Sequence, residues 1–527
     1  MSHLSSVFNS VPVKVPDRSG FDLSHENLFS ATVGTLIPAS VEEVLPGDVC
    51  SIGGSLSVEL PPLATNFKGR VDARLETFFV PNRILWAGWQ DFICQDQTHK
   101  PVVPGFSVAA SIPFVRLGNL ANTIGPGTLA DYLGVKVPSF TVGTTYVDVN
   151  ILPFLAYHKI WDDWYRDSLV QQPFFVDGIE ASTGSNNAFF GVAKLPYLRS
   201  SGTLTSNSGW NTNLSIQGYN GFDVRSLHQR NFAKDYFTTM TTQPQSGAAS
   251  SLSFTVDVNN ASGSFTIASL RTANALQKWL EKNNIGGTRY YDQILAHFGV
   301  MPPDANVNRA VLLGSMTVPV VVNSISQTTN ESTLLQNQKN PYSTQVGAQY
   351  GRGLSFGKDR LVDKFEVKEH GFIITLFSLV PHAYYSTGTR RYLGRSGSGT
   401  FAFPEFAGIG DQEVYASELV SGVALQTGVL WDSANISGYN QRFSEYKYHD
   451  DEIHGILSNG NSLENFVLQR GFSGIPQPST SLLEIPTTFM DDVMISTGAV
   501  SGFNAIVDCY FDSKFLRVMP EYSLPHL

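Results

Sequence analysis

The stretch RVDARLETFFVP, from Arg70 to Pro81, alternates apolar and polar side chains along much of its length. Alternation with a period of two predicts a β-strand with one face toward a core, and Val, Thr and Phe favour strands. A second stretch, GFIITLFSLV from Gly371 to Val380, is almost continuously apolar. Its apolar run of nine residues is too short to span a bilayer, so it also predicts a strand.

Five further stretches carry strand signals and are bounded by Gly, Pro, Asn or Ser. They are SLSVELPPL (55–63), TYVDVNIL (145–152), SFTVDVN (253–259), MTVPVVVNSI (316–325) and NAIVDCYFDSKFLRV (504–518). Some strands follow each other closely, whereas others are separated by about a hundred residues of polar loop and helix. This spacing favours one sandwich core with long insertions over several independent domains.

We therefore predict a mainly β chain that forms a single domain over residues 1–527. The strands are expected in the ranges 50–155, 250–260, 315–325, 365–382 and 500–520, and the insertions in 155–250, 262–315, 323–360 and 383–500. Within the insertions, residues 177–221 and 323–353 are rich in Ser, Asn and Gly and predict long surface loops. The stretch GRGLSFG (351–357) lacks the Lys-Ser/Thr of a phosphate-binding loop and is interpreted as a flexible loop.

The composition is unusual for a soluble chain of 527 residues. Charged residues make up 15%, against roughly 25% in an ordinary domain, and aromatic residues make up 12%. Protein interfaces lose charge and gain aromatic side chains, so we expect much of the surface to meet other protein. The alternative is a large single domain with a favourable ratio of surface to volume.

The net charge of −10 argues against a surface that binds nucleic acid throughout, although one local basic patch remains possible. The three cysteines, Cys50, Cys94 and Cys509, are far apart and odd in number. They form neither a disulfide framework nor a zinc pattern, so we expect buried thiols in a reducing compartment. The N-terminal segment has no apolar core of signal-peptide length, which predicts a soluble chain in a cytosol-like compartment.

Three stretches predict helices. In FLAYHKIWDDWYRD (154–167), Phe154, Tyr157, Trp161 and Trp164 recur at spacings of three and four. The second helix is expected in LRTANALQKWLEKN (270–283) and the third in GGTRYYDQILAHFGVMPPDA (286–305).

The third stretch contains the residues that most invite a catalytic interpretation. Thr288 is suited to cap the helix and Gly299 to end it, while Phe298 belongs to an apolar stripe. His297 lies in the last turn and Asp304 follows two prolines, where each has a structural role. We favour that structural interpretation over a catalytic His–Asp pair.

No nucleophile elbow, zinc-protease motif or Walker loop occurs in the sequence. The most basic stretch is AYYSTGTRRYLGR (383–395), in which arginines alternate with tyrosines, a pattern suited to single-stranded nucleic acid. A second basic stretch is VRSLHQRNFAK (224–234). The candidate DNA-contact residues are Arg390, Arg391, Tyr392, Arg395, Arg225 and Arg230. Either stretch could equally be an inter-subunit contact or a solvated loop.

The stretch YHDDEIHG (448–455) concentrates acidic and imidazole side chains. Asp450, Asp451 and Glu452 supply oxygen ligands of the kind that a hard cation prefers. A solvated acidic turn is the alternative, and we favour it. No cofactor is predicted.

Several stretches, in order along most of the chain, are similar to the major capsid proteins of the Microviridae, small icosahedral phages with single-stranded DNA, and especially to the gokushovirus-like branch. They are residues 36–49, 75–93, 152–167, 230–247, 286–305, 403–419 and 439–455. The closest match is the stretch 286–305, through Thr288, Arg289, Tyr290, Phe298, Gly299 and Asp304. Only about two dozen residues separate Gly247 from Leu270, where gokushoviruses carry a long insertion, so the resemblance is to a divergent member.

The resemblance implies a viral single jelly-roll, an eight-stranded antiparallel β-sandwich with long loop and short helical insertions. It implies a non-enzymatic subunit, sixty copies of which form a T=1 shell around circular single-stranded DNA. The implied partners are a small basic DNA-packaging protein, a pilot or minor spike protein, and a host receptor that surface loops contact. The implied location is the virion, after assembly in the cytoplasm of a bacterial host.

A different class of protein also fits part of the pattern. A carbohydrate-binding or carbohydrate-active β-sandwich would use clusters of Trp and Tyr as platforms for sugar rings, and the chain has 7 Trp and 20 Tyr. A stable monomer that binds glycans would favour this alternative over a shell subunit.

Overall fold

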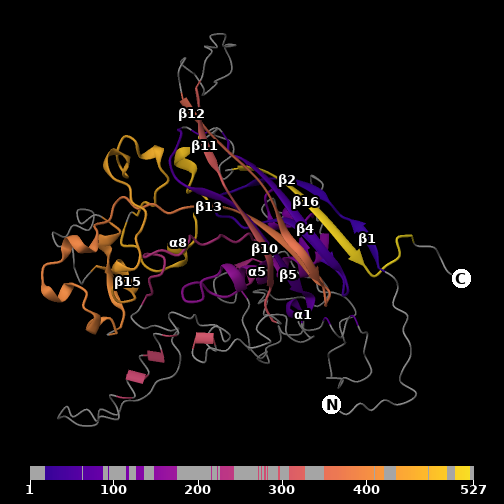
Figure 1. Ribbon diagram of the computed structural model, residues 1–527, viewed down its shortest axis with the longest axis horizontal. Helices are drawn as coiled ribbons and strands as arrows, with labels where there is room; N and C mark the ends of the chain where they lie inside the picture. The colour runs from indigo at the N-terminus through magenta and orange to yellow at the C-terminus, as the bar shows by residue number, and fades with distance from the viewer. Residues whose placement is uncertain are drawn as a thin grey trace.

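Two antiparallel sheets pack face to face and are surrounded by irregular insertions (Figure 1). This arrangement is seen in a computed structural model of the chain. The structure describes residues 18–86 except 62 and 64, 114–117, 126–135, 147–174, 215–216, 222–223, 226–242, 308–326, 349–408, 410–420, 435–472, 474–494 and 505–522, with a few single residues between these ranges.

The first sheet has the strand order β1-β16-β4-β12-β11, and β2 also pairs with β16. Its strands are β1 (Ser19–Asp22), β2 (His25–Ala31), β4 (Val49–Glu59), β11 (Val321–Ser326), β12 (Gln349–Glu366) and β16 (Ala505–Arg517). The second sheet has the order β10-β5-β13-β3. Its strands are β3 (Ile37–Val44), β5 (Val71–Pro81), β10 (Val311–Pro319) and β13 (Gly371–Pro381).

The order of the strands is that of a jelly-roll. Because β1 and β2 pair with different parts of β16, they share one edge position. Strand β11 pairs with β12 and lies outside the sandwich pattern, so it is left out of the count. The remaining strands occupy eight positions, four in each sheet. The first and last strands lie side by side, and the chain crosses repeatedly between the sheets, as two Greek keys require. The predicted eight-stranded jelly-roll sandwich is confirmed.

The alternation of side chains explains how each strand contributes to the core. In β4 and β16 every second residue is buried between the sheets, including Cys50 and Cys509. Strand β13 is buried along its whole length because both of its faces are covered. Ile373 and Phe377 face the sandwich core, whereas Ile374 and its neighbours pack against a second cluster around a helix. This accounts for the continuous apolar run in the sequence.

That helix is α5 (Leu152–Ile160), which continues as a π-helical turn over Trp161–Tyr165. The prediction of a helix here is confirmed, and Phe154, Tyr157 and Trp161 are buried as expected, although Trp164 is 44% exposed. The Tyr157 hydroxyl donates to the carbonyl of Leu36, 2.9 Å away, and so fixes the helix to the sandwich. No helix among the described residues is both long enough and apolar enough to cross a membrane.

The prediction of a flexible loop at residues 351–357 is wrong. These residues belong to β12, which pairs with β4 on one side and with β11 on the other. A Cβ on Gly351 would lie 2.4 Å from the carbonyl oxygen of Thr65, and a Cβ on Gly357 would lie 2.4 Å from a methyl group of Val318. The glycines therefore permit close packing rather than flexibility. The strands β1, β2 and β3, before residue 49, were also not anticipated.

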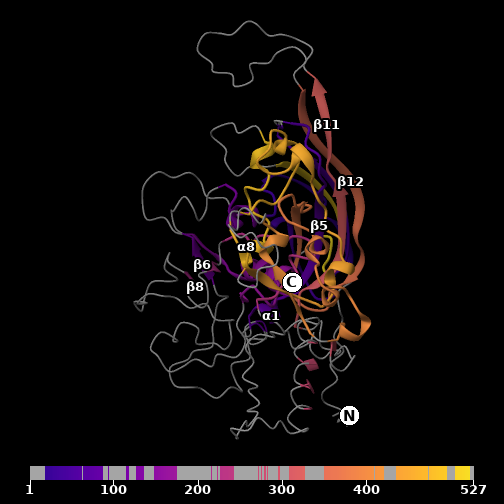
Figure 2. The ribbon, with the colours of Figure 1, turned by 90° about the vertical axis from the view of Figure 1, so that its left-hand side faces the viewer.

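Short elements build the insertions. Between β5 and β10 lie α1 (Asn82–Leu85), β6 (Phe114–Leu117), α4 (Leu129–Tyr132), β7 (Val147–Asn150), β8 (Ser215–Ile216) and β9 (Phe222–Asp223). Between β13 and β16 lie β14 (Gln412–Tyr415), β15 (Ile436–Asn440), α8 (Thr480–Leu483) and the 3-10 helices Arg391–Gly394, Ser398–Thr400, Pro404–Phe406, Ala416–Glu418, Ser444–Tyr446, Gly455–Leu457, Glu464–Phe466 and Asp491–Val493. This second group forms a lobe beside the sandwich, to the left in Figure 1. Figure 2 shows β11 and β12 extending upward beyond the other strands.

Candidate nucleic-acid interface

Arg391, the central arginine of the predicted DNA-contact cluster, is engaged inside the lobe. Its Nη1 donates to the carbonyl of Glu413 at 2.6 Å and to Oε1 of Glu418 at 3.0 Å. The Glu418 side chain is buried, and its other oxygen accepts from the Tyr236 hydroxyl at 3.0 Å. Burial raises the pKa of Glu418 to about 6, while the charge of Arg391 opposes this rise. Arg391 therefore stabilises a buried carboxylate.

Arg395 and Arg390 also have acidic partners in the same chain. Nη2 of Arg395 donates to Oε1 of Glu445 at 2.8 Å, and its guanidinium lies 4.6 Å from the centre of the Tyr446 ring. Arg390 donates from Nε to Oε1 of Glu452 at 2.5 Å. The exposed fraction of the Arg395 side chain is only 8%, whereas that of Arg390 is 36%. Of the three arginines, Arg390 is thus the most accessible to a phosphate.

Arg230 lies outside this cluster and joins two parts of the fold. Its guanidinium bonds Glu76 of β5 through both carboxylate oxygens, and Nη1 also donates to Oγ of Ser378 in β13 at 2.9 Å. The Arg230 side chain is 12% exposed. The structure brings Arg390, Arg391, Tyr392 and Arg395 together and places Arg230 apart from them, while Arg225 lies outside the described residues.

The acidic turn does not form a ligand set. Oδ1 of Asp450 accepts from the backbone N–H of Tyr236 at 3.2 Å, and Glu452 pairs with both Arg390 and His454. Burial raises the pKa of Asp450 to about 6, and the nearby charge of Asp235 adds to this rise. Among the residues that the structure describes, no group of three or more His, Cys, Asp or Glu side chains is arranged to hold a metal. The cation-site prediction for Asp450, Asp451 and Glu452 thus gains no support.

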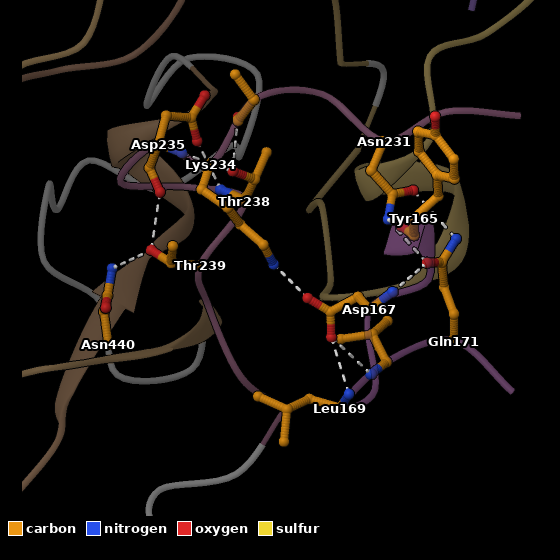
Figure 3. Close-up of polar contacts among 12 residues, drawn as sticks. Tyr165, Asp167, Leu169, Gln171, Asn231, Lys234, Asp235, Thr238, Thr239 and Asn440 are labelled. Atoms are coloured by element: carbon orange, nitrogen blue, oxygen red, sulfur yellow. Dashed lines mark hydrogen bonds and ion pairs between the residues drawn. The ribbon is translucent and has the colours of Figure 1, made fainter. Parts of the chain in front are cut away.

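A cavity of about 560 Å³ opens where four separate segments of the chain meet. Its lining includes the cationic side chains Lys234, Arg442 and Lys447 and the acidic side chains Asp167 and Asp411. Figure 3 shows one wall, where Lys234 and Asp167 form an ion pair and Asp167 accepts from the backbone of Leu169.

Another part of the lining is also fixed by a hydrogen bond, since the Asn440 amide donates to the Thr239 hydroxyl at 3.2 Å (Figure 3). Nε of Arg442 is buried and has no hydrogen-bond partner among the residues that the structure describes. The cavity could receive a small polar or anionic group. Sequence reasoning missed it because its lining comes from segments centred near residues 168, 240, 409 and 443.

Sequence reasoning also missed a set of exposed aromatic and apolar side chains close to the arginines. We name this set the aromatic platform; it comprises Tyr392, Leu393, Phe401, Phe403, Phe406 and Tyr446. Three phenylalanines within FAFPEF (401–406), in a stretch otherwise rich in Gly and Ser, are the signal that could have indicated it.

The signature residues of the stretch 286–305 cannot be placed against these sites. Thr288, Arg289, Tyr290, Phe298, Gly299 and Asp304 lie outside the described residues. Of the helix expected there, Leu295 and Ala296 are described, and both are helical.

Comparison with known proteins identifies the class of this chain. The family model "Capsid protein (F protein)" matches residues 9–527. The chain is 26% identical to Capsid protein VP1 of Chlamydia phage 1, over 100% of this chain and 98% of the relative. It is 24% identical to Capsid protein VP1 of Bdellovibrio phage phiMH2K, over 99% and 98%, and 25% identical to Capsid protein VP1 of Spiroplasma virus 4, over 97% and 95%.

These matches agree with the jelly-roll topology and confirm the resemblance to Microviridae capsid proteins. They also confirm the expectation of a structural protein rather than an enzyme. A capsid protein assembles with further copies into the shell of a virion. From residue 9 to its last residue, this chain belongs to the phage capsid protein (F protein) family.

Proposed function

We propose that this chain is the major subunit of a closed T=1 shell of sixty copies, which encloses the circular single-stranded DNA of a small bacteriophage. The observation that carries the proposal is the family match across residues 9–527 on a jelly-roll with large insertions. The low content of charged residues and the high content of aromatic residues suit a subunit that neighbours cover on several sides.

The charge of the chain indicates what else the particle needs. The chain has a net charge of −10, and its clustered arginines are paired to Glu418, Glu445 and Glu452, so it is poorly suited to neutralise a packaged genome by itself. We therefore infer a small basic packaging protein as a partner that neutralises the genome. A pilot or minor spike protein and a host receptor bound by surface loops complete the proposed partners. Assembly would take place in the cytoplasm of a bacterial host.

DNA contact by Arg390, Arg391, Tyr392, Arg395, Arg225 and Arg230 remains a prediction. The intramolecular ion pairs give most of the described arginines in this set a structural role, so Arg390 is the arginine best placed to reach a phosphate. Binding of a cation by Asp450, Asp451 and Glu452 also stays a prediction.

Sedimentation and negative-stain imaging of the purified chain test the proposed function. We expect closed particles of uniform size that sediment far faster than a single chain. A stable monomer at every concentration, with measurable binding to a glycan array, would contradict the proposal and favour the carbohydrate-binding alternative.

A further inference from the structure

The six side chains of the aromatic platform are large and apolar, yet all of them are exposed to solvent. The exposed fractions are 57% for Tyr392, 63% for Leu393, 51% for Phe401, 45% for Phe403, 43% for Phe406 and 55% for Tyr446. Contiguous apolar patches of this kind on a soluble protein mark interaction sites. Neither the family match nor the jelly-roll topology assigns a role to these residues.

Contacts join the members of the platform in three groups, which all lie within residues 391–406 and at Tyr446. The guanidinium of Arg395 lies 4.6 Å from the ring centre of Tyr446 and 5.5 Å from that of Phe401, so it links the two rings. The rings of Phe403 and Phe406 are 6.1 Å apart in an edge-to-face arrangement. Tyr392 and Leu393 share a 3-10 helix with Arg391, whose ion pair with Glu418 fixes that helix.

The charge beneath the platform argues against nucleic acid as its main occupant. Arg395 already donates to Glu445, and Arg391 lies 3.7 Å from the same carboxylate. A phosphate would have to compete with Glu445 for both guanidinium groups. Rigid aromatic side chains supported by paired arginines are instead the composition of the buried centre of a protein interface.

The area of the platform is enough for the centre of an interface. A large aromatic side chain can bury roughly 200 Å², and about half of each platform residue is exposed. The five aromatic residues therefore offer about 500 Å², and Leu393 adds to this, against the ~800 Å² that one partner contributes to an interface of standard size.

We propose that the aromatic platform packs against a second copy of this chain in the assembled shell. The inference rests on the proposed function, since the family membership makes other copies the available partner. The contact is heterologous when the platform meets a different surface of its neighbour, which is how a closed ring or shell is built. Rigid ion pairs under the platform reduce the entropy lost when the copies associate.

The test uses the variant Leu393→Asp/Phe403→Asp, since neither residue stacks on Arg395 and both are exposed. The matched control is Tyr522→Asp, at a position that is 75% exposed and follows β16. We expect the double variant to raise the concentration needed for association by about 30-fold or more. Thermal unfolding of the dissociated chains should be the same for the wild type, the double variant and the control, and the control should associate like the wild type.

A second measurement identifies the partner. A photo-crosslinking amino acid at position 403, in a mixture of isotopically heavy and light chains, should yield cross-linked peptides that join one heavy and one light copy. Cross-links only to nucleic acid or to an unrelated protein would overturn the inference, as would normal association of the double variant. Equal loss of association in Tyr522→Asp would overturn the inference as well, because an added charge anywhere on the surface would then be enough to prevent association. A wild-type chain that never associates contradicts the proposed function itself, and this is seen before any variant is compared.

Discussion

Arg391 and Glu418 form an ion pair inside the lobe between β13 and β16, with Nη1 of Arg391 3.0 Å from Oε1 of Glu418. The Glu418 side chain is only 4% exposed, and Tyr236 occupies its other oxygen. A carboxylate in such a place is tolerated because a cation faces it. A residue that the sequence suggests as a DNA contact is therefore also part of the packing of its own subunit.

Replacing Arg391 should destabilise the fold. We expect Arg391→Ala to lower the free energy of unfolding by roughly 3 kcal/mol, because it leaves the Glu418 charge buried without its cation. Adding Glu418→Gln should recover part of the loss. The control is Arg360→Ala, whose exposed pair with Asp363 should contribute less than about 1 kcal/mol. Urea unfolding of the four chains measures the difference, and equal effects of both arginine variants would rule out the structural role.

The DNA-contact hypothesis makes a separate prediction for the particle. Shells of Arg390→Ala/Arg391→Ala should hold less DNA than wild-type shells. Arg391 also pairs with the buried Glu418, so a loss of DNA in the double variant could come from a less stable subunit. The single variant Arg390→Ala tests DNA contact without removing that buried ion pair. The ratio of nucleic-acid to protein absorbance in purified particles gives the DNA content. Unchanged DNA content in Arg390→Ala particles of normal stability would remove Arg390 from the contact set.

Much of the fold was predictable because strand periodicity reports burial directly. The alternation in residues 70–81 and the apolar run in 371–380 both correspond to strands, β5 and β13. Strand β12 was missed because Gly351, Gly353 and Gly357 suggested a loop, whereas they accommodate side chains from neighbouring segments. A single sequence does not show whether a glycine serves flexibility or close packing, since that depends on residues distant in the chain.

The surroundings of the candidate sites could not be predicted, for a similar reason. Arg390, Arg391 and Arg395 lie near one another because they are close in sequence, but the carboxylates that engage them come from positions 418, 445 and 452. The cavity lined by Lys234 and Arg442 depends on segments about two hundred residues apart. Local composition identifies a cluster, whereas tertiary contacts decide whether its charges are free.

Close approach of the two sheets leads to a prediction about Gly314. It lies at a bulge between β10 and β5, and a Cβ there would be 1.7 Å from the carbonyl oxygen of Leu361. Because the clash involves backbone, we expect Gly314→Ala to cost about 2 kcal/mol or more. Gly20→Ala in β1 is the control, since a Cβ there meets nothing within 4 Å. Chemical denaturation compares them, and a neutral Gly314→Ala would disprove the close approach.

Glu484 should make stability depend on pH. It accepts a hydrogen bond from the Gln171 amide at 2.9 Å, and burial raises its pKa from the usual 4.5 to about 7. Between these two values the folded chain binds a proton that the unfolded chain releases, so stability rises as the pH falls through this window and is lost as the pH rises. Glu484→Gln removes this dependence.

His228 acts in the opposite direction and must be separated from this effect. Burial first, and the neighbouring His158 second, hold the pKa of His228 well below its usual 6.5, so its contribution to stability is lost as the pH falls below that value. Comparing wild type with Glu484→Gln at each pH cancels the His228 effect, since both chains contain it. We expect wild type to gain stability relative to Glu484→Gln from about pH 8 to about pH 5. A difference that stays constant with pH would show that Glu484 titrates normally in the folded chain.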